Sequence, residues 1–172
     1  MALEYALEHK AELQAAWLKT ARDPRYRWLH GIANWWELEC KLEDSTWSRV
    51  QMVHVAHGVV AGYLAGTRES TGCFSNLTVA NFGTPTMAFG LDVARFLDHL
   101  FVDLGAPRVQ WSVVANNPVR DTYHELARRL GGRCWGHSTR SVLVGREYRD
   151  EEWFEVLAED YFAAKGVRHG DS

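Results

Sequence analysis

The sequence lacks the features that mark secreted, membrane-spanning and nucleic-acid-binding proteins. Its three cysteines, Cys40, Cys73 and Cys134, follow no spacing pattern, which indicates reduced thiols rather than a disulfide scaffold or a zinc site. No apolar run approaches the ~18 residues of a membrane span. The first 17 residues carry charges throughout, unlike a signal peptide. Lysine and arginine total 19 against 22 aspartates and glutamates, which argues against general nucleic-acid binding. We therefore expect a cytoplasmic protein without a metal site.

The composition is that of one globular domain. The chain has 172 residues, of which 47% are hydrophobic and 12% are aromatic. Eight tryptophans are enough to bury a large apolar area. The sequence shows no internal repeat, no low-complexity tract and no linker rich in proline or serine. We therefore expect a single domain over residues 1–172, which acts as a monomer or a homodimer.

The first part of the sequence predicts helices. An incomplete apolar stripe of leucines and Trp17 predicts a helix over residues 3–19. Asp23 followed by Pro24 is typical of a helix start, and predicts a second helix from about residue 25 to 38.

From residue 49 onwards, strands and helices alternate. Residues rich in β-branched side chains predict two strands around a tight turn at Gly58. Apolar residues at helical spacing predict a helix that ends at Gly105. The predicted elements are strands over 50–57, 59–67 and 73–80, a helix over 90–104, a strand over 108–115, a helix over 118–130, and strands over 133–144 and 147–161, the last with a possible helix over 151–164. This order indicates an α/β chain with an antiparallel meander ahead of a β-α-β unit.

Several short segments form a recognisable arrangement. They are the strand Asn76-Leu77-Thr78-Val79, Gly90 with the helix that follows it, the strand end Val113 to Pro118, the helix end Leu130-Gly131-Gly132, and the terminal stretch from Gly145 through Leu157. Together they resemble the GCN5-related N-acetyltransferases, and most closely the branch of ribosomal-protein alanine acetyltransferases. The resemblance implies a mixed, mostly antiparallel sheet of about six or seven strands with flanking helices. It also implies a parallel strand pair that splays apart.

The resemblance implies an activity as well as a fold. Acetyl-CoA would be the co-substrate, and its acetyl group would pass directly to a primary amine, either a protein N-terminus or a small molecule. Residues 50–160 would form the cofactor-binding core, and residues 1–48 a helical segment on the acceptor side. A protein of a second class, which binds acyl-CoA or a partner without turnover, is the alternative.

The cofactor residues follow from the same resemblance. The first amides of a helix have no partner within it and favour a pyrophosphate. The residues expected to supply them are Met87, Ala88, Phe89, Gly90 and Leu91. The family's loop usually reads Gln/Arg-x-x-Gly-x-Gly/Ala, but here Pro85 replaces the first residue and Ala88 the first glycine. The alternative is an ordinary loop with a packing glycine.

The splayed strands would bind the rest of the cofactor. Main-chain groups at Leu77, Thr78 and Val79 would face the acyl arm, and one of these amides would polarise the thioester carbonyl. Asn117 would mark the splay. Asn117 can also cap the helix that follows it, and both roles are compatible.

The catalytic residues are the least defined by the sequence. By the resemblance, the acid that protonates the leaving thiolate is Tyr123, with His124 as the alternative. Tyr123 can equally be an aromatic packing residue. Several residues are candidates for the general base, but a water chain or an already neutral amine would serve as well. These candidates are His54, His57, Glu69, Ser75 and Asn76. His54 and His57 are expected on opposite faces of one strand.

Two further clusters lie toward the N-terminus. Four tryptophans, Trp28, Trp35, Trp36 and Trp47, form either an aromatic wall for the acceptor or part of the core. The basic cluster near Tyr26 comprises Arg22, Arg25 and Arg27, and is expected either to be solvated or to meet an anion.

Overall fold

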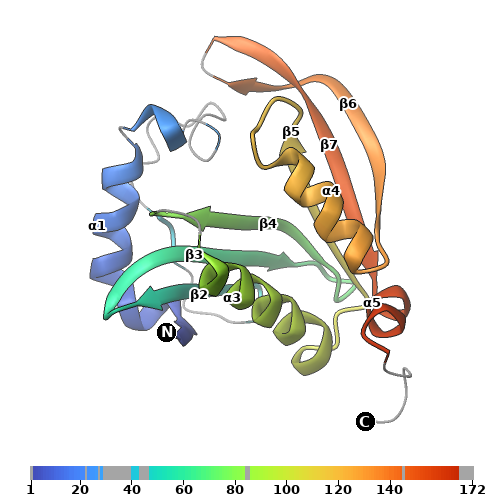
Figure 1. The fold of residues 1–172 in the computed structure, drawn as a ribbon, viewed down its shortest axis with the longest axis horizontal. Helices are drawn as coiled ribbons and strands as arrows, with labels where there is room; N and C mark the ends of the chain where they lie inside the picture. The colour runs from blue at the N-terminus through green and yellow to red at the C-terminus, as the bar shows by residue number, and fades with distance from the viewer. Residues whose placement is uncertain are drawn as a thin grey trace.

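The structure is built around one mixed β-sheet (Figure 1). The computed structural model describes residues 2–21, 23–26, 28, 40–42, 47–83, 86–144 and 146–166. Among these, seven strands pair in the order β1-β2-β3-β4-β5-β7-β6. The strands are β1 (Ala2–Tyr5), β2 (Arg49–Ala56), β3 (Val59–Arg68), β4 (Phe74–Asn81), β5 (Arg108–Val114), β6 (Arg133–Val144) and β7 (Glu147–Leu157). All neighbouring strands are antiparallel except β4 and β5. The predicted mixed, mostly antiparallel sheet is therefore confirmed.

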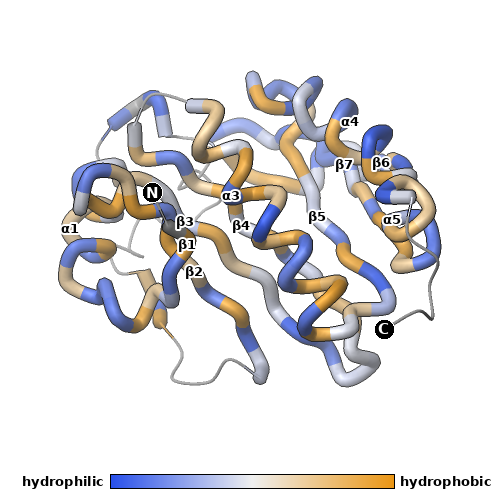
Figure 2. The backbone as a smooth tube through the Cα atoms, turned by 60° about the horizontal axis from the view of Figure 1, so that its bottom comes forward, coloured by the Kyte–Doolittle hydropathy of each residue, from blue (hydrophilic) through white to orange (hydrophobic). Residues whose placement is uncertain are grey.

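The helices lie on both faces of this sheet. They are the short 3-10 turns η1 (Ala6–His9) and η2 (Pro24–Tyr26), the helices α1 (Lys10–Ala21), α3 (Met87–Asp98), α4 (Arg120–Arg129) and α5 (Ala158–Ala164), and the π-turn η3 (His99–Asp103) that extends α3. Hydrophobic and hydrophilic residues alternate along α3 and α4 (Figure 2), as expected for helices with one face on a core. No helix in the described part of the chain is long and apolar enough to span a membrane.

The β-rich part of the sequence was predictable. Strands β2 and β3 join at His57 and Gly58, which have φ angles of 53° and 74°, so the tight turn at Gly58 is confirmed. The last predicted strand ends at Leu157 and continues as α5, so the helical alternative for its end is correct.

Three predicted helix boundaries are wrong. Residues 2–5 form a strand rather than the start of a helix, because all four pair with residues 52–55 of β2. Helix α3 begins at Met87, three residues before the predicted start, because Thr86 caps it: the Thr86 hydroxyl accepts from the Phe89 amide at 3.2 Å. Helix α4 begins at Arg120 rather than at residue 118. The predicted helix over 25–38 lies mostly outside the described residues.

Strands β4 and β5 touch at one end only. A single residue pair, Phe74 and Val109, joins them, and Figure 1 shows the two strands diverging beyond it. The register between β3 and β4 also shifts near Asn76, whose φ angle is 51°. Such a bulge bends a strand and increases its local twist. The expected splayed parallel pair is therefore present.

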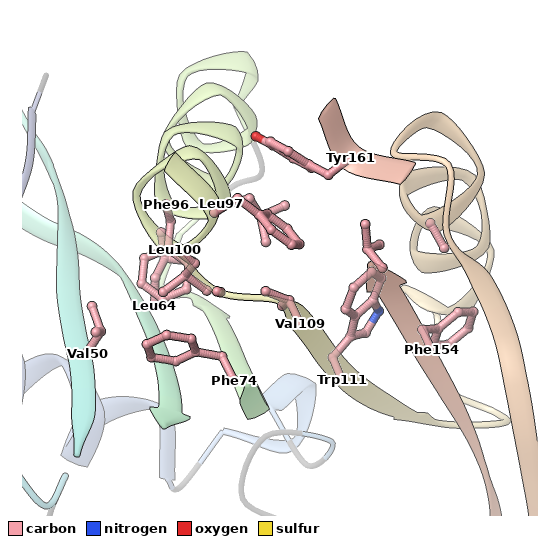
Figure 3. Close-up of a cluster of buried hydrophobic side chains, with 14 of the residues drawn as sticks. Val50, Leu64, Phe74, Phe96, Leu97, Leu100, Val109, Trp111, Phe154 and Tyr161 are labelled. Carbon is pink, nitrogen blue, oxygen red and sulfur yellow. The ribbon is translucent and has the colours of Figure 1, made fainter. Parts of the chain in front are cut away.

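The sheet buries a core on each face. The larger cluster lies under α3 and α4 and runs from Val50 on β2 to Phe154 on β7 (Figure 3). The smaller cluster lies under α1 and joins Leu13 to Val53, Tyr63 and Ala80. Only the larger cluster crosses from β4 to β5, and it closes one side of the splay.

Candidate acyl-CoA site

The gap between β4 and β5 is the central feature of the site. Beyond Phe74, the edge of β4 that faces β5 has no strand partner among the described residues. The facing edge of β5 is equally unpaired, because β5 bonds to β7 on its other side. Backbone N–H and C=O groups on both edges are thus available to an extended ligand. Leu77, Thr78 and Val79 lie along this gap, where the sequence predicted them, and all three are half-buried.

Helix α3 begins just after β4, at the open end of the gap. The amides of Met87 and Ala88 belong to the first turn, where a helix offers free N–H groups and positive partial charge. The Phe89 amide is already bonded to Thr86 Oγ1. The Gly90 amide donates to Thr86 O at 3.2 Å, so it is not free to bind a phosphate, contrary to expectation.

Gly90 nevertheless leaves space at this helix end. A Cβ atom built at Gly90 would meet no atom within 4 Å, so a ligand can approach the backbone closely there. The neighbouring Leu91 is 55% exposed. Pro85, which stands where the resembled family has Gln or Arg, lies outside the described residues. Sequence reasoning missed Thr86, although a threonine just before a helical apolar pattern is a recognised start signal.

Tyr123 lies on α4, over β5. Its ring meets those of Trp111 and Phe154 edge to face, at 6.4 Å and 6.5 Å between centroids. Burial raises the pKa of Tyr123 to about 12, so its hydroxyl stays protonated at neutral pH. No described residue forms a hydrogen bond with that hydroxyl. The ring is therefore packed, as one alternative predicted.

His124, the alternative acid, is held elsewhere. Its Nε2 lies 2.7 Å from Glu152 Oε2 on β7, and its ring packs edge to face against Phe154. Arg120 binds the other oxygen of Glu152 at 2.8 Å. Burial acts to raise the pKa of Glu152, but the hydrogen bonds from Arg120 and His124 outweigh it and leave the pKa below its ordinary value. His124 thus belongs to an ion cluster on β7, away from the edge of β5 that lines the gap.

The candidate bases are scattered. His54 is 2% exposed, and its Nδ1 donates to Asp92 Oδ2 at 2.6 Å, which ties β2 to α3. His57 is exposed in the turn after β2, so the expectation that it lies on a strand opposite His54 is wrong.

Glu69 lies at the closed end of the gap. It is exposed in the turn before β4, and its amide donates to Cys73 O at 2.8 Å. A Cβ at Gly72 in the same turn would lie 3.7 Å from Pro107, next to the start of β5. Ser75 and Asn76 are on β4 itself, half-buried and exposed respectively. The structure therefore does not bring Glu69 to the open end with Tyr123 and α3.

Asn117 follows β5 at the open end of the gap. Its side-chain oxygen accepts from the Val119 amide at 3.1 Å, and its own amide donates to Val114 O at 2.8 Å. Asn117 therefore forms a local turn, but it does not cap α4 as expected, because Val119 precedes the helix and no side chain caps it. Its position at the end of β5 also agrees with the place predicted for it at the splay.

The N-terminal clusters are only partly described. Trp47 is 73% exposed, and the Arg68 guanidinium lies 4.1 Å from the centroid of its ring, so Trp47 is not a core residue. Trp28 is half-buried. Arg25 pairs with Asp23 at 2.6 Å and is solvated. Trp35, Trp36, Arg22 and Arg27 lie outside the described residues.

Solved structures with the same architecture provide the comparison. No family model and no curated protein sequence matches the chain. A GCN5-related N-acetyltransferase from Brucella melitensis is 26% identical, with a TM-score of 0.68 over 95% of this chain and 78% of that one. A variant of the spermidine N-acetyltransferase from Vibrio cholerae is 15% identical, with a TM-score of 0.70 over 96% and 99%.

The Vibrio cholerae enzyme has also been solved in complex with CoA and spermine. That structure is 17% identical to this chain, with a TM-score of 0.56 over 67% of this chain and 69% of that one. The chain has the fold of the GCN5-related N-acetyltransferases.

Proposed function

We propose that this protein transfers the acetyl group of acetyl-CoA to a primary amine. The gap between β4 and β5, with the start of α3 at its open end, carries this proposal. An extended acyl arm can pair with the unpaired strand edges, while the pyrophosphate meets the amides of Met87 and Ala88. The architecture of known N-acetyltransferases, one of them solved with CoA and spermine, supports it.

The proposed reaction is a direct transfer. A main-chain amide at Leu77–Val79 donates to the thioester carbonyl, which develops negative charge during attack. The neutral amine forms the new N–C bond, and the C–S bond breaks as the tetrahedral intermediate collapses. The thiolate takes the proton of the Tyr123 hydroxyl. The proton lost by the amine passes to water, and water returns a proton to the Tyr123 phenolate, which restores the acid. Tyr123 is preferred to His124 because His124 is engaged by Glu152.

The alternative is a protein that binds acyl-CoA without turnover. One observation favours it: in the described part of the chain, none of the histidines or carboxylates predicted as bases lies at the open end of the gap. Acetylation of a ribosomal-protein alanine, the finer prediction from the sequence, is one acceptor class among amines, and the spermidine enzymes act on another.

Calorimetry with acetyl-CoA is the first test, with coenzyme A alone as the comparison ligand. We expect micromolar binding of both and, after addition of amines, release of free thiol. Binding without thiol release from any amine would favour the non-catalytic alternative. No binding at millimolar acetyl-CoA would contradict both forms of the proposal.

A further inference from the structure

The two faces of the β5–β7 strand pair differ in what covers them. Trp111, Glu152 and Phe154 face α4, as their contacts with Tyr123, Arg120 and His124 show. Because side chains alternate along a strand, Ser112, Glu151 and Trp153 face the opposite side. We call these three residues the Glu151 face. On that side of the sheet, α1 packs against β3, where Trp17 meets Tyr63 at 5.8 Å between ring centroids.

Glu151 is the unpaired carboxylate among the neighbouring glutamates of β7. Glu152 binds Arg120 at 2.8 Å, and Glu155 binds Arg133 at 2.7 Å. Glu151 instead accepts a single hydrogen bond, from Ser112 Oγ at 2.7 Å. No described arginine, lysine or histidine pairs with it, although it is half-buried. A half-buried carboxylate in this position attracts a cation.

Aromatic rings continue the Glu151 face. Trp153 lies two residues beyond Glu151 on the same side of β7 and is half-buried. The ring of Trp135, at the bulge of β6, lies 6.2 Å from the Trp153 ring between centroids, and Trp135 is 50% exposed. An indole face attracts an ammonium group, and it packs equally well on the methylene chain that carries one.

The Glu151 face borders the gap. The hydrogen bond to Ser112 draws the Glu151 carboxylate over β5, the strand whose free edge lines the splay. Tyr123 lies against Trp111, the neighbour of Ser112, on the other side of β5. The acid proposed for the leaving thiolate and the free carboxylate are therefore on opposite sides of one strand. An acceptor on the Glu151 face would reach the thioester from the side away from Tyr123.

We propose that the Glu151 face binds the acceptor, and that the acceptor is a small amine carrying a second cationic group. This inference rests on the proposed acetyl transfer. The reacting nitrogen must be neutral to attack, so a carboxylate gains little from binding it. Glu151 is suited to the second, charged nitrogen, with the Trp153 ring against the connecting methylenes. A protein N-terminal amine alone would bring no such second charge to Glu151.

Paired acceptors of equal length test this assignment. We would measure thiol release with 1,4-diaminobutane and with n-butylamine, for wild type and for Glu151→Gln, which keeps a side-chain oxygen that can accept from Ser112. We expect wild type to prefer the diamine. Glu151→Gln should raise the KM for the diamine about tenfold and change the KM for n-butylamine little. Trp153→Leu should raise the diamine KM by a smaller factor. Glu147→Gln, an exposed glutamate of the same strand that pairs with Arg149, is the control and should match wild type.

The outcomes separate this inference from the proposed function. Thiol release without preference for the diamine, or an equal effect of Glu151→Gln on both amines, would overturn the inference and leave acetyl transfer intact. If no amine releases thiol, calorimetry with 1,4-diaminobutane and the CoA-loaded protein decides. If wild type binds the diamine and Glu151→Gln binds it more weakly, the proposed role of the Glu151 face is supported even without turnover. If wild type does not bind the diamine, that role is overturned.

Discussion

The two halves of the sheet, on either side of the gap, use their faces differently. In the first half, β1 to β4 are covered by α3 on one face and by α1 on the other, and each face has a buried cluster. In the second half, α4 covers one face of β5, β7 and β6, and the other face carries Ser112, Glu151 and Trp153. The first half is thus packed on both faces, whereas the second half leaves a polar and aromatic face beside the gap.

This difference predicts that buried charge matters most in the first half. Asp92 is 1% exposed and binds His54 at 2.6 Å and Arg95 at 2.8 Å. Asp92→Asn would leave Arg95 without its carboxylate and would weaken the buried contact with His54, so it should lower the free energy of unfolding by about 3 kcal/mol. Urea unfolding of wild type and Asp92→Asn at pH 7 measures this loss of stability.

The same molecule provides a matched control. His99 and Asp103 form a pair of the same kind, at 2.7 Å, but Asp103 has 64% of its side chain exposed. Asp103→Asn should change the free energy of unfolding by less than ~0.5 kcal/mol. Equal losses for the two variants would mean that the tie between β2 and α3 is no stronger than a surface pair.

The second prediction concerns the gap between the two halves of the sheet. Tyr123 packs on Trp111 and Phe154 in the second half, while the amides proposed to bind the cofactor belong to α3 in the first. Tyr123→Phe keeps the ring packing and removes the acid, so the rate of thiol release should fall by roughly 10²-fold or more. Calorimetry should show an unchanged affinity for acetyl-CoA. A loss of affinity together with rate would instead assign Tyr123 to binding or packing.

The third prediction compares glycines of the two halves. A Cβ at Gly132 would lie 2.4 Å from the Glu155 carbonyl oxygen, whereas a Cβ at Gly62 would lie 2.4 Å from the Phe89 ring. Backbone cannot move aside as a side chain can, so Gly132→Ala should destabilise by about 2–3 kcal/mol and Gly62→Ala by about 1 kcal/mol less. Thermal unfolding followed by circular dichroism ranks them.

Gly90→Ala is the control, because it should raise stability where the other two glycine substitutions lower it. A Cβ there meets no atom within 4 Å, and an alanine stabilises a helix relative to glycine by about 0.5–1 kcal/mol. We expect the variant to be more stable and yet to bind acetyl-CoA more weakly, if the missing side chain lets the cofactor approach. Stabilisation with unchanged affinity would show that Gly90 has no part in cofactor binding.

Local patterns predicted most of the sheet but not the ends of its helices. Strands β2 to β7 follow alternating or β-branched runs bounded by glycine, a signal contained in each segment itself. The strand Ala2–Tyr5 has no such signal, because pairing with β2 decides its conformation. The sequence pattern predicts that α3 begins at Gly90, whereas Thr86 caps the helix and it begins at Met87.

The candidate site shows the same limit. Tyr123 and the strand Leu77–Val79 were predicted as site residues from their places in a familiar order of elements, and that prediction awaits the tests above. The pairs His54–Asp92 and Ser112–Glu151 were missed because their members are 38 and 39 residues apart. Only the packing of α3 on β2 and the register of β5 with β7 bring them together. Contacts that depend on register are not visible in the local sequence pattern.

The last prediction concerns the stability contributions of two adjacent glutamates, Glu151 and Glu152. Glu152 faces α4 and binds Arg120 and His124, whereas Glu151 faces the other side. Because the pKa of Glu152 is lowered on folding, its contribution to stability is present above its unfolded pKa and lost as pH falls through the folded pKa. Glu152→Gln should therefore cost about 1 kcal/mol at pH 7, since Arg120 is partly exposed. The difference from wild type should shrink as pH falls below the ordinary glutamate pKa of about 4.3 and vanish once pH has fallen through the lower folded pKa.

Urea unfolding of wild type, Glu152→Gln and Glu151→Gln between pH 3 and 8 measures this difference. Glu151 makes one hydrogen bond, to a hydroxyl, which glutamine can also accept, so Glu151→Gln should follow the wild-type curve while changing the acceptor KM. Glu152→Gln should change the stability curve and leave the ratio of diamine to monoamine KM as it is. Two variants that differ by one position along β7 would then report separately on the packed face and on the open face of the same strand. A stability loss shared equally by both would mean that the second half of the sheet depends on both faces for its packing, and the contrast between the halves would not hold.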